Sequence, residues 1–314
     1  MNFQITKLNK ELKEAIHKIN KPLLGIYQNG NVQIAIFEDG TKIVQTNDDE
    51  FHYDFATNID IKITDYCANN CPFCFEGSSD KGRHGDLNHP ILDTLHPYQE
   101  IALGGGNPLS HPDLESFLIR MKKKRVIVNM TVHQKDFMDS YEQLKQWTEA
   151  GWIHGLGISL INPTPELIAK VQTIPTAILH VIDGLVSKET LQTLSDNNLK
   201  ILILGYKSKE RGLDYQSRNN TTISKNIQYL AKNINYWTNH FTLVSFDNLA
   251  CEHLNMQGNC TEQEWNITYM GDDGTQTFYI DLVREECALN STSTDRKSIN
   301  QDMNVDKAFH HVRL

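Results

Sequence analysis

The chain has 314 residues, 39% of them hydrophobic, and a formal net charge of −9 at pH 7. This composition suits a globular protein with a full core, and no apolar run approaches the length of a membrane span. The acidic balance argues against nucleic acid as a partner, because nucleic-acid-binding proteins carry a broad basic face. Six cysteines are few for a secreted disulfide scaffold and no signal peptide is recognised, so we expect a cytoplasmic location.

The first 57 residues are expected to form a unit of their own. Residues 1–20 carry Lys and Glu in an amphipathic pattern that predicts a helix. Apolar runs follow at 23–27, 32–37 and 41–46, separated by an Asn-Gly and an Asp-Gly pair, which are strong hairpin signals. The sequence therefore predicts an N-terminal helix and a three-stranded antiparallel β-meander.

Three cysteines, Cys67, Cys71 and Cys74, lie in one short run, spaced four and then three residues apart. Iron–sulfur clusters are normally held by four Cys thiolates, so this set would fill three corners of a cluster and leave one iron without a protein ligand. Zinc would need a fourth ligand, which His84 or His89 downstream could supply. The compact spacing favours the cluster with an open iron.

From residue 58 to residue 210 strands alternate with helices, which predicts βα units and a parallel sheet. The expected strands are 59–64, 101–103, 126–131, 154–160, 177–182 and 200–205. The expected helices lie near 90–96, 112–123, 136–150, 165–172 and 188–196. In βα barrels the chemistry lies at the carboxyl ends of the strands. Cys67 follows the first expected strand and Gly104 follows the second.

A glycine run, Gly104-Gly105-Gly106-Asn107, forms a second motif at the end of the second expected strand. Glycine permits φ > 0 and a close approach of backbone to a ligand. The run alone is a weak signal, because a plain strand-to-helix turn also explains it. Its position at the same edge of the sheet as the cysteines makes it a candidate binding loop.

The Cys-x₃-Cys-x₂-Cys spacing, with Phe73 before the last Cys, resembles the signature of radical S-adenosylmethionine (radical SAM) enzymes. The resemblance implies a partial (β/α)₆ barrel and a [4Fe–4S] cluster on Cys67, Cys71 and Cys74. It implies that SAM chelates the open iron and is cleaved reductively to a 5′-deoxyadenosyl radical, chemistry that side chains cannot supply. The expected class is an oxidoreductase or transferase, and an electron donor such as flavodoxin or ferredoxin is implied.

The same resemblance assigns residues to SAM. The backbone at Phe73 would lie near the adenine, and the run from Gly104 to Gly106 resembles the family's "GGE" segment, which binds the SAM amino group. Asn107 stands where the family usually has Glu, so a charge-assisted bond is replaced by a neutral one. Ser159, at the end of the fourth strand, is expected to meet the ribose. Thr131 and His180, near the ends of the third and fifth strands, are further cofactor-binding candidates.

The polar loop over residues 75–86 carries three glycines and is expected to cover the cluster and close on substrate. A solvated surface loop is the plainer interpretation. If the loop does close, its charged and polar side chains are candidate substrate contacts: Glu76, Arg83, His84 and Asp86.

Residues 211–314 are expected to form a C-terminal α+β extension. The sequence predicts a helix over 219–235, a strand over 241–245, a hairpin over 269–283 around its Asp-Gly pair, and a tail that is loosely ordered from Ser291 until the apolar Phe309 and Val312. The hairpin resembles a degenerate SPASM or Twitch-type extension, as found in radical SAM enzymes that act on peptides. Three cysteines in this region are one too few for a four-thiolate auxiliary cluster: Cys251, Cys260 and Cys287.

The expected function is hydrogen abstraction from a peptide or protein side chain by a radical SAM enzyme. A small metabolite or nucleoside is the alternative substrate, since it needs no docking surface and fits the incomplete set of C-terminal cysteines. A different class is a non-catalytic Fe–S or zinc-binding interaction protein, in which Asn107 would mark lost SAM affinity.

Overall fold

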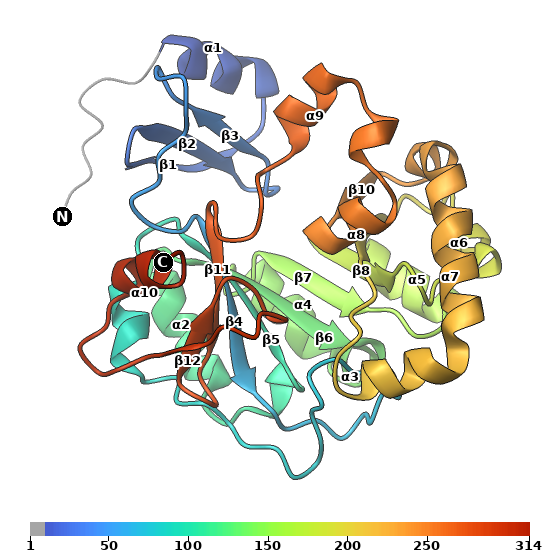
Figure 1. Cartoon of the computed structure of the whole chain (residues 1–314). Coiled ribbons are helices and arrows are strands. Elements are labelled where there is room, and N and C mark those ends of the chain that lie inside the picture. The colour runs from blue at the N-terminus through green and yellow to red at the C-terminus, as the bar shows by residue number, and fades with distance from the viewer. Residues whose placement is uncertain (1–9) are drawn as a thin grey trace.

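The computed structural model describes residues 10–314, and a parallel β-sheet forms its centre (Figure 1). All six strands predicted between residues 58 and 210 are present within a few residues of their expected ends, and a seventh parallel strand follows them. They are β4 (Asn58–Thr64), β5 (Glu100–Gly105), β6 (Ile127–His133), β7 (Gly155–Ser159), β8 (Ala177–Ile182), β9 (Lys200–Leu204) and β10 (Leu243–Phe246).

Helices alternate with these strands as the sequence predicts. They are η1 (Pro90–Thr94), α2 (Leu114–Lys124), α3 (Gln134–Asp139), α4 (Tyr141–Glu149), α5 (Pro165–Gln172) and α6 (Lys188–Leu194). The single helix expected over 136–150 is two, because the chain leaves helical geometry at Ser140, where φ is −114°. The helix expected near 90–96 is a short 3₁₀ turn that begins at Pro90.

The two faces of the sheet differ in burial. On β6, Val128, Met130 and Val132 are buried in the core that the helices cover, while the alternate residues Asn129 and Thr131 are only half-buried. Side chains in a strand alternate between faces, so one face supplies the core and the other remains partly open. The partly open face carries polar and small residues.

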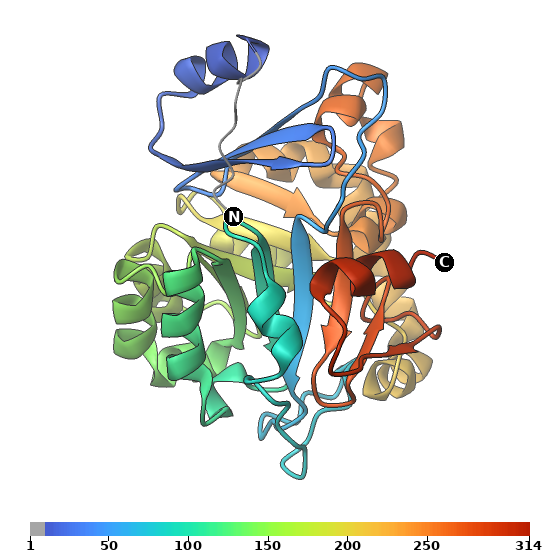
Figure 2. The ribbon, with the colours of Figure 1, turned by 90° about the vertical axis from the view of Figure 1, so that its left-hand side faces the viewer.

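The C-terminal part adds elements to the same sheet. They are α7 (Arg211–Trp237), α8 (Asn248–His253), α9 (Glu262–Thr268), β11 (Thr277–Asp281), β12 (Glu286–Ala288), β13 (Lys297–Ser298) and α10 (Val305–His311). β11 pairs in parallel with β4, and β12 and β13 continue antiparallel. The strand order is therefore β10-β9-β8-β7-β6-β5-β4-β11-β12-β13. Figure 2 shows β11 beside β4, although more than two hundred residues separate them in the chain.

The hairpin predicted over residues 269–283 is wrong. Its Asp-Gly pair does form a turn, but residues 269–276 contain no strand. Tyr269 donates its backbone N–H to the Trp265 carbonyl and stacks on the Trp265 ring at 4.3 Å, which ties the start of this segment to the end of α9. The hairpin lies one element later, between β11 and β12.

The tail from Ser291, predicted to be loosely ordered as far as Phe309, is packed before that point: Ile299 and Val305 are buried and β13 pairs with β12. Phe309 in α10 is fully buried and its ring lies 5.8 Å from that of Phe278 in β11. The expected strand over 241–245 is β10, and the helix expected over 219–235 is the longer α7. The domain boundaries at residues 57 and 210 stay a prediction.

The N-terminal unit has the predicted form. Helix α1 (Lys10–Ile19) precedes β1 (Leu23–Asn29), β2 (Val32–Phe37) and β3 (Lys42–Gln45), which pair as an antiparallel meander separate from the main sheet. The part of the expected helix before Lys10 lies outside the described residues.

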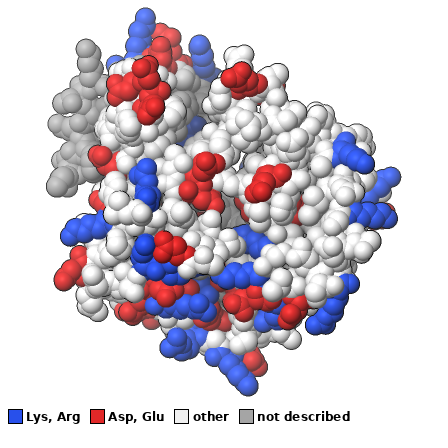
Figure 3. Space-filling view, viewed as in Figure 1, with Lys and Arg blue, Asp and Glu red and all other residues white. Residues whose placement is uncertain are grey.

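The charge on the surface and the hydropathy of the helices agree with what the composition predicts. On the face shown in Figure 3, acidic and basic side chains of the described residues are interspersed, with no broad basic area. None of the helices within residues 10–314 combines the length and apolar character that crossing a bilayer requires. The α/β class with a large parallel sheet is confirmed, and its open order runs from β10 at one edge to β13 at the other.

Candidate active site

The three cysteines lie in a loop at the carboxyl end of β4, which we call the cluster loop (residues 65–79). The base of the loop is closed by backbone hydrogen bonds: the Cys67 N–H donates to the Ser79 carbonyl at 2.8 Å, and the Ser79 N–H donates to the Asp65 carbonyl at 3.1 Å. Cys67, Cys71 and Cys74 are free and half-buried. The loop therefore presents its thiols at the edge of the sheet where the sequence placed them.

The pKa of the Cys71 thiol depends on burial and on the charged groups around it. Burial raises the pKa of the Cys71 thiol, the charges of Cys74 and Cys67 raise it further, and the Arg211 guanidinium lowers it. Within residues 10–314 no set of three His, Cys, Asp or Glu side chains is arranged to bind one metal ion. Three thiols without a fourth ligand match three corners of an iron–sulfur cluster in number, whereas a tetrahedral zinc needs four ligands.

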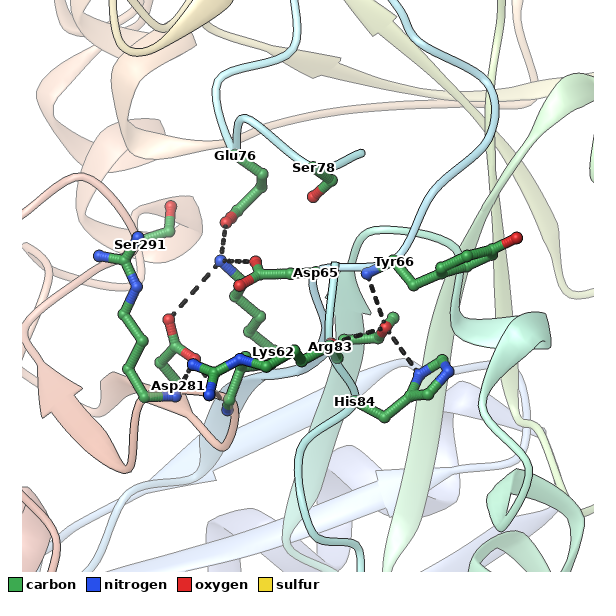
Figure 4. Close-up of polar contacts among 12 residues, drawn as sticks. Lys62, Asp65, Tyr66, Glu76, Ser78, Arg83, His84, Asp281 and Ser291 are labelled. Atoms are coloured by element: carbon green, nitrogen blue, oxygen red, sulfur yellow. Dashed lines mark hydrogen bonds and ion pairs between the residues drawn. The ribbon is translucent and has the colours of Figure 1, made fainter. Parts of the chain in front are cut away.

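The two histidines considered for zinc have other partners. Nδ1 of His89 accepts the Ile91 N–H at 3.2 Å and caps η1, and His89 is buried. Nδ1 of His84 lies 2.9 Å from the Thr64 hydroxyl (Figure 4). His89 is tied to η1 and His84 to β4, and in both rings Nδ1 already has a partner, which weakens the Cys₃His alternative.

The glycine run joins the cluster loop directly. The Gly106 N–H donates to the Thr64 carbonyl and the Asn107 N–H donates to the Tyr66 carbonyl, both at 2.7 Å. A Cβ on Gly106 would lie 2.2 Å from the Tyr66 carbonyl oxygen, so only glycine fits there. Gly105 has φ +106°, a conformation that favours glycine.

Gly104 differs from its two neighbours. No atom lies within 4 Å of the place where its Cβ would be. Its missing side chain therefore leaves open space beside the cluster loop, whereas the other two glycines bring two backbones together. Open space at this point suits a bound cofactor, and close packing behind it suits a rigid wall.

Asn107 has a role that the sequence did not predict. Its Oδ1 accepts the Leu109 N–H at 3.1 Å and caps the short 3₁₀ turn η2 (Pro108–Ser110). An amide oxygen has two lone pairs, so the same atom can still accept a second hydrogen bond. The oxygen expected to meet the SAM amino group is therefore held in a fixed orientation.

Thr131, Ser159 and His180 come together on the partly open face of the sheet. Thr131 pairs with Gly157 on β7, and Ser159 pairs with His180 on β8. A Cβ on Gly157 would lie 2.8 Å from the Thr131 hydroxyl and 2.4 Å from the His180 ring, so both side chains lean over this glycine. Burial lowers the pKa of His180 to about 4, which keeps the ring neutral at neutral pH.

Phe73 lies beside a small cavity. Its ring meets that of Tyr215 edge-on at 5.9 Å, and the two line a space of about 210 Å³. The other walls come from the ends of β7 and β8 and from the chain that follows them: Leu160, Ile161, Val181, Ile182, Leu185, Val186 and Thr190. Most of the residues that line the cavity are apolar, and it lies at the carboxyl edge of the sheet.

A buried lysine, Lys62, is the main feature that sequence reasoning missed. Only 3% of its side chain is exposed, and three carboxylates surround its ammonium group (Figure 4): Asp65 at 2.5 Å, Glu76 at 2.9 Å and Asp281 at 3.6 Å. Burial alone would lower the pKa of Lys62, but the charges of Glu76 and its neighbours outweigh burial and raise it. The lysine thus joins β4, the cluster loop and β11 by charge.

Strand β4 also carries Asp60, which is exposed although it lies in a central strand. It shares the partly open face with Lys62 and pairs with Ala102. The surrounding protein raises the pKa of the Asp60 carboxyl by burial, even though the side chain is accessible to solvent. Alternation of Ile with Asp60 and Lys62 in the sequence was the signal that could have identified this polar face.

Most of the loop residues considered as substrate contacts already have partners in the loop or in β4. Glu76 pairs with Lys62, and Oδ1 of Asp86 accepts the Asn88 N–H at 2.7 Å. His84 contacts Thr64, and the Arg83 carbonyl accepts the Asp65 N–H at 2.8 Å. The side-chain contacts favour a structural role for Glu76, His84 and Asp86, whereas the contact of Arg83 involves its backbone alone.

The C-terminal cysteines are not gathered in one place. Cys287 is fully buried in β12, whereas Cys251 and Cys260 are half-buried and close enough for their charges to interact. Burial, the charge of Asp247 and that of Cys260 raise the pKa of Cys251. The resemblance to a SPASM or Twitch-type extension stays a prediction.

Comparison with protein-family models finds a match to the radical SAM superfamily over residues 61–206. This segment is a radical SAM domain. It contains the cluster loop, the glycine run and the three polar residues on β6, β7 and β8. No curated protein gives a significant match.

Crystal structures of Streptococcus suis SuiB have a similar fold. SuiB bound to the precursor peptide SuiA has a TM-score of 0.55 and 11% identity, over 82% of this chain and 65% of SuiB. SuiB bound to S-adenosylmethionine has a TM-score of 0.51 and 13% identity, over 78% and 64%. A further SuiB structure has a TM-score of 0.53 and 12% identity, over 82% and 66%. The chain thus spans just under two thirds of SuiB, and at these identities the likeness concerns the fold.

Gly106→Ala should disturb the cluster loop, whereas Gly104→Ala should leave the fold intact. The added Cβ meets the Tyr66 carbonyl oxygen at position 106 and open space at position 104. Overpacking of this kind costs about 1–3 kcal/mol. Thermal or denaturant unfolding of the two purified variants measures the difference. Equal stability of the two would contradict the close approach of the backbones.

The stability of the protein should fall as the pH drops from about 6.5 to about 4. Because the pKa of His180 is lowered from 6.5 to about 4, the unfolded chain takes up this proton before the folded chain does. The loss of unfolding free energy is at most about 3 kcal/mol, and it is smaller where solvent at the partly open face of the sheet screens the charge. Denaturant unfolding across this pH range should show a smaller loss in His180→Gln; an equal loss would contradict the assignment.

Proposed function

We propose that the chain is a radical SAM enzyme that holds a [4Fe–4S] cluster through Cys67, Cys71 and Cys74. The proposal rests on one observation: the three thiols and the glycine run are joined, backbone to backbone, at the carboxyl edge of the sheet within a radical SAM domain. When bound, the cluster and SAM supply a 5′-deoxyadenosyl radical able to abstract hydrogen from a substrate.

In this proposal different residues of the site bind different parts of SAM. The open space at Gly104 receives the amino-acid part, where Oδ1 of Asn107 can accept an N–H bond from the amino group. The cavity beside Phe73, which combines apolar side chains with polar backbone groups, is suited to the flat adenine ring. Ser159 and Thr131 offer hydroxyl groups to the ribose, and the neutral His180 ring adds a donor or acceptor without adding charge.

For the substrate we propose a peptide or protein side chain. SuiB, which shares the fold over 82% of this chain, has been crystallised with a precursor peptide. The N-terminal meander leaves β1 as the outer strand of a small sheet, and an extended peptide can pair with such an edge. A reductant such as flavodoxin or ferredoxin would supply the electron.

A small metabolite or nucleoside is the second candidate substrate. The dispersal of Cys251, Cys260 and Cys287 favours it, because the C-terminal part then lacks the four-thiolate set of an auxiliary cluster. Transfer of deuterium into 5′-deoxyadenosine from a labelled peptide or from a labelled metabolite separates the two.

Cys71→Ala should abolish cluster binding. After anaerobic reconstitution the variant should lack the iron content and brown absorbance of the wild type and should release no 5′-deoxyadenosine from SAM. Cys260→Ala, which changes a half-buried thiol outside the cluster loop, is the matched control and should keep both. A Cys71→Ala protein that still cleaves SAM would refute the proposed function. A wild-type protein with a cluster but no SAM cleavage would support the non-catalytic class.

Asn107→Asp should bind SAM more tightly than the wild type. The carboxylate keeps the acceptor that caps η2 and adds a charge facing the SAM amino group, and charge-assisted bonds are about twice as strong as neutral ones. A gain of about 1 kcal/mol corresponds to roughly fivefold in Kd. Equilibrium titration of the reconstituted protein measures this. Unchanged or weaker binding in a variant of normal stability would place the amino group elsewhere.

A further inference from the structure

Arg211, the first residue of α7, reaches back to the cluster loop. Its Nε donates to the Cys71 carbonyl at 3.0 Å, and its Nη2 donates to the Ser78 carbonyl at 2.9 Å. These two carbonyls lie on either side of Cys74. One planar guanidinium therefore bridges two points of the loop, a geometry that the single ammonium of lysine cannot reproduce.

The start of α7 is packed tightly against the loop. A Cβ on Gly212 would lie 2.5 Å from the Lys207 carbonyl oxygen and 3.3 Å from that of Phe73. Just before the helix, Glu210 adopts φ +48° and ψ −130°, an unfavourable conformation for a residue with a side chain. Such strain costs about 1–3 kcal/mol and persists where the surroundings require it. The backbone is thus held in the position that directs Arg211 at the loop.

The neighbouring lysines are engaged elsewhere. Nζ of Lys207 donates to the Ser291 hydroxyl at 3.1 Å and lies 4.3 Å from the centre of the Phe75 ring. Nζ of Lys209 lies 3.5 Å from the Ser291 carbonyl oxygen. Lys62 is surrounded by carboxylates. Arg211 is therefore the cation whose hydrogen bonds go to the backbone of a cysteine in the loop.

We propose that Arg211 is a positioning residue that fixes the cluster loop and that its charge raises the reduction potential of the cluster bound there. The inference rests on the proposed function. The net charge near an iron–sulfur cluster is one of the factors that set its potential. Because reduction adds a negative charge, a fixed positive charge beside one ligand stabilises the reduced state. The same contact limits the freedom of the loop between residues 71 and 78.

Two substitutions separate the effect of charge from that of the two hydrogen bonds. Arg211→Lys keeps the charge and loses the fork, whereas Arg211→Met loses both. Arg218→Met, which changes an exposed arginine on the same helix, is the matched control. The full chain is used throughout, first iron-free and then after anaerobic reconstitution.

Hydrogen–deuterium exchange of the iron-free proteins tests positioning. Amides between residues 71 and 79 should exchange faster in Arg211→Lys and in Arg211→Met than in the wild type, and Arg218→Met should match the wild type. A redox titration followed by electron paramagnetic resonance tests charge. The potential should fall in Arg211→Met and stay near the wild-type value in Arg211→Lys.

The outcomes distinguish this inference from the proposed function. Unchanged exchange and an unchanged potential in Arg211→Met would overturn the inference while leaving the enzyme assignment intact. A wild-type protein that binds no iron would overturn the proposed function and the inferred effect on potential, and the exchange data would still decide the positioning role. If Arg211→Met does not fold, Arg211→Lys decides the positioning role. Amide exchange equal to that of the wild type in this variant would rule out a contribution from the two guanidinium hydrogen bonds.

Discussion

The candidate site depends on the close contact between two backbones, that of the glycine run after β5 and that of the chain leaving β4. Two hydrogen bonds of 2.7 Å join them, and a side chain on Gly106 would prevent both. The contact fixes the cysteine loop and the proposed SAM-binding edge relative to each other without any long side chain. Glycine carries a conformational cost in a strand, and here that cost is offset by the joining of two segments that the function needs side by side.

A second constraint is the burial of Lys62 among three carboxylates. A buried charge destabilises a protein unless it is paired, and breaking such a set is more costly than never forming it. Two of its partners, Asp65 and Glu76, come from the cluster loop, and the third, Asp281, from β11. The same group of charges therefore connects the thiols to the C-terminal strands. It also engages the carboxylate of Glu76, which the sequence alone suggested as a substrate contact.

Much of the site could be read from the sequence because its signals are local. The cysteine spacing, the glycines and the alternation of strands with helices each lie within a short window, and the strands were found within a few residues. Contacts between distant segments could not be read in this way. The Asp-Gly pair near residue 273 signals a turn, but nothing nearby reveals that β11 pairs with β4, or that Arg211 bonds a carbonyl 140 residues earlier in the chain. The cap formed by Asn107 is local, yet an amide has several possible partners and the sequence does not choose among them.

The place of β11 in the sheet has a consequence for the order in which the protein is made. β4 emerges early from the ribosome, but its neighbour β11 and the carboxylate of Asp281 are more than two hundred residues away in the chain. Until they arrive, one edge of β4 is unpaired and the ammonium of Lys62 lacks one of its partners. Domains generally fold as units during synthesis, and this one cannot close around its first strand until nearly the whole chain has left the ribosome. Completion of the cluster loop and its surroundings is thus a late event in biogenesis, even though its cysteines are among the first quarter of residues to be translated.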